Sequence, residues 1–209
     1  KYWFDRMRAK LIAFLDPPNR TLRRLEEGDE SELTLMKRAV ALHRLPAPDD
    51  ALRAIDKLIA LRPEDPYYWE LKGQILFESG RAQAAVEPLR RAVSLAPSEP
   101  LIIGALGRAL LSMNDPALDA EALAALEAAR SSRPETTVLR DLATAYARAG
   151  REGEAALATA ERFMMQGSMK DSLRHARFAI EKLPTGSPGW LKADDIRATA
   201  ERAVAAQNQ

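Results

Sequence analysis

Apolar residues recur at helical spacing along most of the chain. In residues 1–15, Trp3, Met7, Leu11 and Phe14 are three or four positions apart, which predicts an amphipathic helix. Similar segments follow one another between short stretches that contain proline or glycine, and runs of β-branched residues are scarce. The pattern therefore predicts an all-α protein of about eleven to twelve antiparallel helices.

The helical segments repeat along the chain. Pro63 and Pro97 close two matching segments and are 34 residues apart, which is the tetratricopeptide period. In the unit that begins at Pro66, Gly73 is small enough to let two helices approach closely, and Gly80 falls at the turn between them. The sequence therefore predicts a tetratricopeptide-repeat (TPR) solenoid, in which each helix packs against its neighbours in the chain.

Toward the end of the chain the spacing is half a repeat. Gly150, Gly167 and Pro184 follow one another at intervals of 17 residues, half of the period given above. The helix between the two glycines is therefore expected to be the second helix of one pair and the first helix of the next.

Three parts of the chain are predicted. Residues 1–31 form an N-terminal helical segment that leads into the stack, residues 32–186 form the TPR-like repeats, and residues 187–209 form a C-terminal capping helix with a frayed tail. Ser187 is a suitable N-cap and Pro188 is favourable in the first turn of the last helix. Such a helix would cover the exposed face of the final pair.

Composition and charge exclude a nucleic-acid partner, cysteine chemistry and a membrane-spanning helix. Lysine and arginine number 31 against 30 acidic residues, so the net charge is +1, and we expect no nucleic-acid partner. The chain has no cysteine, which excludes disulfides and thiol catalysis. The longest apolar stretches, such as Leu101–Leu106, are too short to span a membrane.

The sequence contains no recognisable catalytic or metal-binding motif. Its two histidines, His43 and His175, are 132 positions apart, and neither has a second ligand one helical turn away. No Gly-x-Ser-x-Gly elbow or phosphate-binding loop is present. The pair Asp194 and Asp195 is early in the last helix, where acids favour the helix dipole. We therefore predict no catalytic residue, no metal ligand and no cofactor in this chain.

The remaining candidate site is a groove. In TPR stacks the first helix of each pair lines the concave side, and its residues here are aromatic, aliphatic and basic, a mixture that suits a bound peptide or helix. Taken singly, each of these residues could equally be ordinary surface or core. The predicted groove consists of Met36, His43, Arg44, Tyr67, Glu70, Gln74, Phe77, Arg108, Arg140, Thr144 and Arg148.

Several segments resemble a known family. The stretch Leu183–Leu191, followed by Ala193–Ile196, is similar to the C-terminal end of BepA-like periplasmic zinc metalloproteases, in which a protease domain precedes a TPR domain. Residues 70–74, 78–81 and 6–11 resemble the same proteins. The resemblance extends over nearly the whole chain, and its closing motif is the more specific part.

The resemblance implies a function that composition alone does not. It implies the substrate- or partner-docking C-terminal part of a periplasmic metallopeptidase in outer-membrane protein quality control, with outer-membrane assembly machinery or unfolded outer-membrane proteins as partners. The family's His-Glu-x-x-His motif has no counterpart here, so zinc is expected only in a missing protease domain. Because the chain opens at Lys1, we expect it to be a piece of a longer protein. The alternative is a stand-alone TPR scaffold or adaptor unrelated to a protease.

Overall fold

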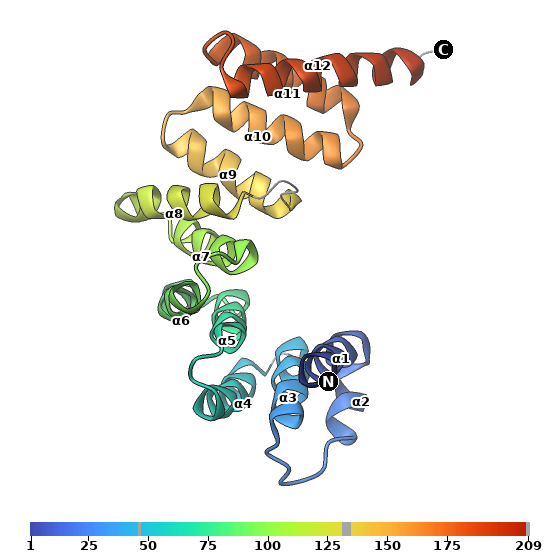
Figure 1. The fold of residues 1–209 in the computed structure, drawn as a ribbon, viewed down its shortest axis with the longest axis vertical. Helices are drawn as coiled ribbons and strands as arrows, with labels where there is room; N and C mark the ends of the chain where they lie inside the picture. The colour runs from blue at the N-terminus through green and yellow to red at the C-terminus, as the bar shows by residue number, and fades with distance from the viewer. Residues whose placement is uncertain (46, 131–134, 208–209) are drawn as a thin grey trace. The chain divides into compact units, whose positions relative to one another are not determined.

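A computed structural model describes residues 1–45, 47–130 and 135–207 (Figure 1). These residues form twelve helices and no strand, which confirms the predicted all-α class and the expected number of helices. The chain falls into two compact units, Lys1–Ala105 and Leu106–Gln209. We call them unit 1 and unit 2 and describe each separately.

Unit 1 consists of helix pairs preceded by two N-terminal helices. Its pairs α3–α4 and α5–α6 pack internally, α4 packs against α5, and both α1 and α2 pack against α3 (Figure 1). Its helices are α1 (Tyr2–Leu15), α2 (Pro18–Arg23), α3 (Glu32–Arg44), α4 (Pro48–Leu61), α5 (Pro66–Glu78), α6 (Ala82–Leu95) and the first residues of α7 (Pro100–Ser112).

The glycines of the best-matching repeat have the two roles expected of them. A Cβ at Gly73 would lie 2.5 Å from Cγ of Leu89, so only glycine permits α5 and α6 to pack this closely. Gly80 has φ = +79°, the left-handed conformation that ends α5 and turns the chain into α6. Asp65 begins α5 by accepting a hydrogen bond from the main-chain N–H of Tyr67 at 3.0 Å.

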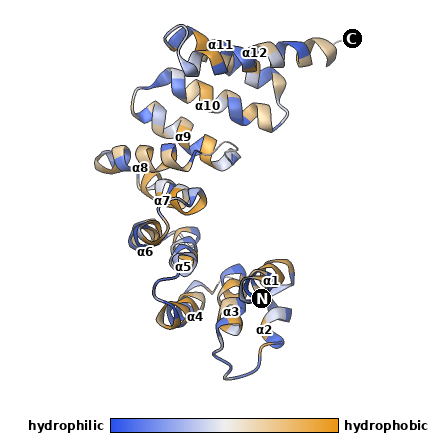
Figure 2. Ribbon diagram, in the orientation of Figure 1, coloured by the Kyte–Doolittle hydropathy of each residue, from blue (hydrophilic) through white to orange (hydrophobic). Residues whose placement is uncertain are grey.

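Helix α1 is present as predicted, but of the four residues in its predicted apolar stripe only Phe14 packs against the core, and the other three point away from it. Ala9 and Ala13 are buried against α3, with exposed fractions of 2% and 0%. Trp3, Met7 and Leu11 are exposed by 59%, 61% and 57%. Figure 2 shows apolar and polar residues along α1, and the side with most of its large apolar residues is not the side that is buried. Here the face with small residues is the buried one.

Unit 2 continues the alternation of packed helices. Helix α10 packs against both α9 and α11, which confirms the prediction from the half-repeat spacing (Figure 1). Helix α12 packs against α11 and α10, as expected of a capping helix. The helices of unit 2 are the remainder of α7, α8 (Pro116–Ala129), α9 (Thr136–Arg148), α10 (Glu152–Met165), α11 (Met169–Lys182) and α12 (Pro188–Gln207).

Local signals in unit 2 place the helix starts. Asp115 accepts a hydrogen bond from the N–H of Ala117 at 3.0 Å, and the Ser187 hydroxyl accepts one from the N–H of Trp190 at 3.2 Å. The division between the two units lies within α7. None of the boundaries between the predicted parts 1–31, 32–186 and 187–209 falls there. Of the predicted frayed tail, residues 208 and 209 lie outside the described residues.

Candidate functional site

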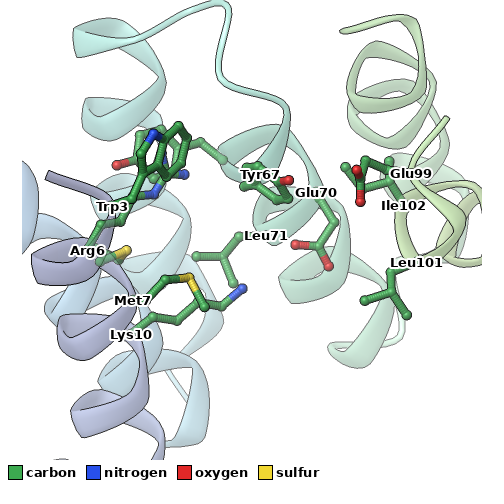
Figure 3. A pocket seen from close by; sticks show the side chains of 12 residues that line it. Trp3, Arg6, Met7, Lys10, Tyr67, Glu70, Leu71, Glu99, Leu101 and Ile102 are labelled. Carbon is green, nitrogen blue, oxygen red and sulfur yellow. The ribbon is translucent and has the colours of Figure 1, made fainter. Parts of the chain in front are cut away.

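A cleft of about 400 Å³ opens in unit 1 between α1, α5 and the first residues of α7 (Figure 3). One wall is the N-terminal helix, and the opposite side is built from the first helices of successive repeats. Its lining residues are Trp3, Arg6, Met7, Lys10, Met36, Tyr67, Tyr68, Glu70, Leu71, Glu99, Leu101 and Ile102.

A buried ion pair holds α1 in place at the cleft. The guanidinium of Arg6 forms a two-pronged salt bridge with Asp65, in which Nη2 lies 2.8 Å from Oδ1. The same guanidinium lies 4.4 Å from the ring centre of Tyr68 and 5.2 Å from that of Trp3. Burial alone would lower the pKa of Arg6, but the hydrogen bonds to Asp65 raise it, so Arg6 stays charged.

A second polar cluster supports the first. Both hydroxyls, of Tyr2 in α1 and of Tyr68 in α5, donate to Oε1 of Glu32 at 2.5 Å, and Nε of Arg62 donates to Oε2 at 2.8 Å. Burial alone would raise the pKa of Glu32, but these hydrogen bonds lower it. The pKa of Tyr68 is raised, first by burial and then by its bond to Glu32. The network therefore links α1, α3 and α5 around one ionised carboxylate.

Large apolar side chains stand exposed on both sides of the cleft. Leu101 at the start of α7 is 64% exposed, and Tyr67 in α5 is 38% exposed. Trp3 and Met7 face them from α1 (Figure 3). Exposed apolar groups around a concavity are characteristic of binding sites, because a ligand side chain placed between them removes apolar surface from water.

Two carboxylates line the same cleft. Glu70 is half-buried on α5, and Figure 3 shows its side chain directed into the space between α5 and Leu101. Burial raises the pKa of Glu70, nearby Glu78 raises it further, and Lys10 opposes the shift. Glu99 is also half-buried and lies just before α7.

Three of the predicted groove residues line this cleft. Tyr67 and Glu70 contribute side chains to its wall, and the structure brings them together with Met36. Met36 is only 1% exposed, so it forms the floor and is part of the core as well. Binding by these residues remains a prediction.

Three other predicted residues lie nearer the C-terminal ends of α3 and α5. Nε2 of His43 lies 2.7 Å from Oε2 of Glu78, and Nε2 of Gln74 donates to Oε1 of the same carboxylate at 2.8 Å. Phe77 is half-buried. His43 and Glu78 also line a smaller hollow of about 290 Å³, so these residues do not belong to the main cleft.

Arg44 has a structural role in this fold. Its guanidinium donates hydrogen bonds to the main-chain carbonyls of Ala13, at 3.0 Å, and Asp16, at 2.5 Å. Both carbonyls belong to the C-terminal end of α1, where helix carbonyls lack partners within the helix. Arg44 thus anchors the end of α1.

The predicted residues of unit 2 already have partners within the chain. Arg108 and Arg140 both bind the buried carboxylate of Asp141, with Nε–O distances of 2.8 and 3.0 Å. Arg148 donates to a main-chain carbonyl of α7 at 2.9 Å and to a carboxylate of α8 at 3.1 Å. Thr144 is exposed and donates to the carbonyl of Arg140 at 3.2 Å. These three arginines therefore have structural partners within unit 2, and their binding of an acidic partner remains a prediction.

The sequence prediction of the groove did not include the contribution of α1. Trp3, Met7 and Lys10 form one side of the cleft, although the pattern identified their helix correctly. Their position depends on the contact between Arg6 and Asp65, which are 59 residues apart. No local signal reveals a pairing at that distance, whereas the exposed apolar stripe could have indicated a surface for a partner.

The described residues bring no group of three histidine, aspartate or glutamate side chains into a position to hold a metal ion. None of their helices combines the length and the apolar character needed to cross a bilayer.

Comparisons with known proteins identify the repeat. The sequence model of the tetratricopeptide repeat matches residues 37–100, a segment that runs from α3 to the start of α7. No curated protein matches the chain.

Solved TPR proteins share the fold. MamA from Desulfovibrio magneticus RS-1 superposes with a TM-score of 0.61 at 18% identity, covering 88% of this chain and 100% of that one. Another MamA crystal structure gives a TM-score of 0.56 at 21% identity, covering 78% and 89%. YrrB, described as a TPR protein with an unusual peptide-binding site, gives 0.60 at 16% identity, covering 83% and 90%. The predicted all-α TPR fold is therefore confirmed.

Proposed function

We propose that this chain is a polypeptide-binding TPR module without a catalytic centre, and that unit 1 binds its partner in the cleft beside α1. The observation that carries the proposal is the set of exposed apolar side chains, Leu101, Tyr67, Trp3 and Met7, around one concavity. The likeness to YrrB supports it, since that protein is described as having a peptide-binding site. The repeat match supports it as well.

The energetics of the cleft favour an apolar anchor. Burying one Leu- or Phe-sized side chain contributes roughly 1.5–3 kcal/mol. A volume of about 400 Å³ has room for such side chains but not for a folded element. The walls are fixed before binding, because Arg6 and Asp65 hold α1 against the repeats. A preformed cleft loses less conformational entropy when a ligand binds.

The test uses a panel of short synthetic peptides with single apolar anchors, measured by fluorescence anisotropy. Leu101→Asp introduces a charge at the cleft, and we expect at least a tenfold loss of affinity. Leu191→Asp is the matched control, because Leu191 is similarly exposed, by 52%, on α12 in unit 2. Equal binding by the wild type and Leu101→Asp, or equal loss in both variants, would reject the cleft.

We further propose that the module is the docking part of a BepA-like periplasmic zinc metallopeptidase, with zinc in a separate protease domain. The resemblance of residues 183–196 supports this proposal. Phe4, Leu11 and Leu15 support it physically, since they are exposed on α1 outside the cleft and form a surface that a folded domain could cover. Reading the gene upstream of Lys1 is the test: absence of a His-Glu-x-x-His motif would leave a stand-alone scaffold.

The partners expected from that resemblance are outer-membrane assembly machinery or unfolded outer-membrane proteins. An unfolded β-barrel chain is rich in alternating apolar residues, which suits a cleft that accepts apolar anchors. Binding of a urea-unfolded outer-membrane porin, diluted into buffer with the protein, should be weakened by Leu101→Asp. Binding that is insensitive to this substitution would argue against such substrates at this site.

A further inference from the structure

The apolar cleft has an acidic side. Glu70 on α5 and Glu99 before α7 both line it. Among the described residues, neither side chain forms a hydrogen bond or a salt bridge. By contrast, Asp65 binds Arg6, and Asp56 binds Lys72 at 2.7 Å. The two cleft carboxylates are available to a ligand.

We propose that Glu70 and Glu99 recognise a lysine or arginine side chain of the bound polypeptide, adjacent to the apolar residue that fills the cleft. The inference rests on the proposed function and adds the chemistry of the ligand. An apolar residue beside a basic residue is then the minimal recognised motif.

The net charge of the residues that line the cleft favours a cationic ligand. Two cations line it, but Arg6 is already neutralised by Asp65. Lys10 remains, opposed by the two carboxylates of Glu70 and Glu99. The cleft therefore carries an excess of negative charge in a partly buried setting, where charge complementarity selects between ligands.

The position of Glu70 strengthens the argument. It is half-buried on the cleft wall; burial disfavours its ionised form, Lys10 partly offsets this, and the neighbouring carboxylate of Glu78 adds to it, so that the pKa of Glu70 is raised. A carboxylate whose pKa is raised in this way destabilises the free protein, and a further cation close to it would relieve that cost. A ligand ammonium or guanidinium would supply that cation. Destabilising groups of this kind are retained where they serve binding.

An acidic ligand is the competing possibility. The predicted groove contains Arg108, Arg140 and Arg148, which would attract acidic groups. In unit 2 these side chains are bound to internal partners, two of them to Asp141. The cleft in unit 1 would repel an acidic residue placed next to its anchor, so the observations favour a basic one.

The experiment compares three versions of each binding peptide, with lysine, glutamine or glutamate beside the apolar anchor. Affinity is measured by fluorescence anisotropy for the wild type, for Glu70→Gln, for Glu99→Gln and for the double variant. Glu64→Gln is the matched control: Glu64 belongs to unit 1, is exposed and pairs with Arg91, outside the cleft. Each change to glutamine keeps the shape of the side chain and removes its charge.

We expect the wild type to bind the lysine peptide about tenfold more tightly than the glutamine peptide, equivalent to about 1.4 kcal/mol. The double variant should lose this preference while its affinity for the glutamine peptide is unchanged, and Glu64→Gln should behave as the wild type. Added salt should weaken only the lysine peptide.

Two other outcomes overturn the inference and are distinguishable. If the peptides bind with sensitivity to Leu101→Asp but without a preference for lysine, or prefer glutamate, the cationic motif is wrong and the polypeptide cleft stands. If no peptide binds, or if Leu101→Asp changes nothing, the polypeptide cleft fails and the cationic motif fails with it.

Discussion

Replacing Arg6 by methionine should detach α1 from unit 1. The side chains of Arg6 and Asp65 are 5% and 9% exposed, and methionine fills much of the arginine's volume without its charge. The change leaves the Asp65 carboxylate buried and without its cation. Breaking a buried ion pair in this way costs about 3 kcal/mol or more. Contacts of the guanidinium with the rings of Tyr68 and Trp3 are lost in addition.

The cost should appear locally, because the pair joins α1 to α5. Amide hydrogen exchange followed by mass spectrometry measures the opening of α1 separately from the rest of the chain. About 3 kcal/mol corresponds to exchange that is more than a hundredfold faster, or to complete loss of protection if α1 is held by less than that. Amides of α10 in unit 2 provide the internal reference.

Two variants separate this mechanism from a general loss of stability. Arg6→Met combined with Asp65→Asn removes both charges, and asparagine can still cap α5, so much of the protection of α1 should return. Arg53→Met removes an arginine from an exposed pair with Asp50 and should change little. Unchanged exchange of α1 in Arg6→Met would refute the reasoning, and so would equal effects of Arg6→Met and Arg53→Met.

Three further outcomes are expected. Gly73→Ala should lower the free energy of unfolding in urea by about 1–3 kcal/mol, because the new Cβ would lie 2.5 Å from Leu89; an unchanged midpoint would contradict the close approach of α5 and α6. Glu70→Gln should raise stability at neutral pH by about 1 kcal/mol or less, because the raised pKa of Glu70 means that the folded state favours the neutral form of this side chain. In the wild type, stability should accordingly fall as pH rises through that pKa. A loss of stability in Glu70→Gln would show that the carboxylate is paired. Glu32 should behave oppositely, because its lowered pKa gives stability that is present above the ordinary carboxyl pKa of 4.5 and is lost as pH falls. Glu32→Gln should therefore flatten the acid side of the curve of stability against pH. An unaltered curve would count against the hydrogen-bond network around Glu32.

The fold could be predicted from the sequence because its determinants are local. The 34-residue interval from Pro63 to Pro97 and the turn glycine at Gly80 set helix lengths and corners, and each helix needs only its neighbours to bury its apolar face. Close packing at Gly73 follows from the same repeat. In a solenoid, the order of the helices along the chain therefore predicts most of the contacts between them.

The candidate site could be predicted only in part. Tyr67 and Glu70 face the cleft as their repeat positions indicated. The repeat positions of Arg44 and Arg108 were equally suitable, yet these side chains are bound to a carbonyl at the end of α1 and to Asp141. A position in a repeat determines the side of a helix, but the partner of a long charged side chain depends on what lies across from it.

For α1, the sequence by itself determined that residues 1–15 form a helix with one apolar side. The tertiary structure decided which side is buried. Ala9 and Ala13 pack against α3, and the charge of Arg6 is satisfied by Asp65, so the face with Trp3 and Met7 turns outward and forms the cleft wall. The physical reason is that small side chains permit close helix contact and a buried charge requires its partner, and that partner lies 59 residues away in the sequence.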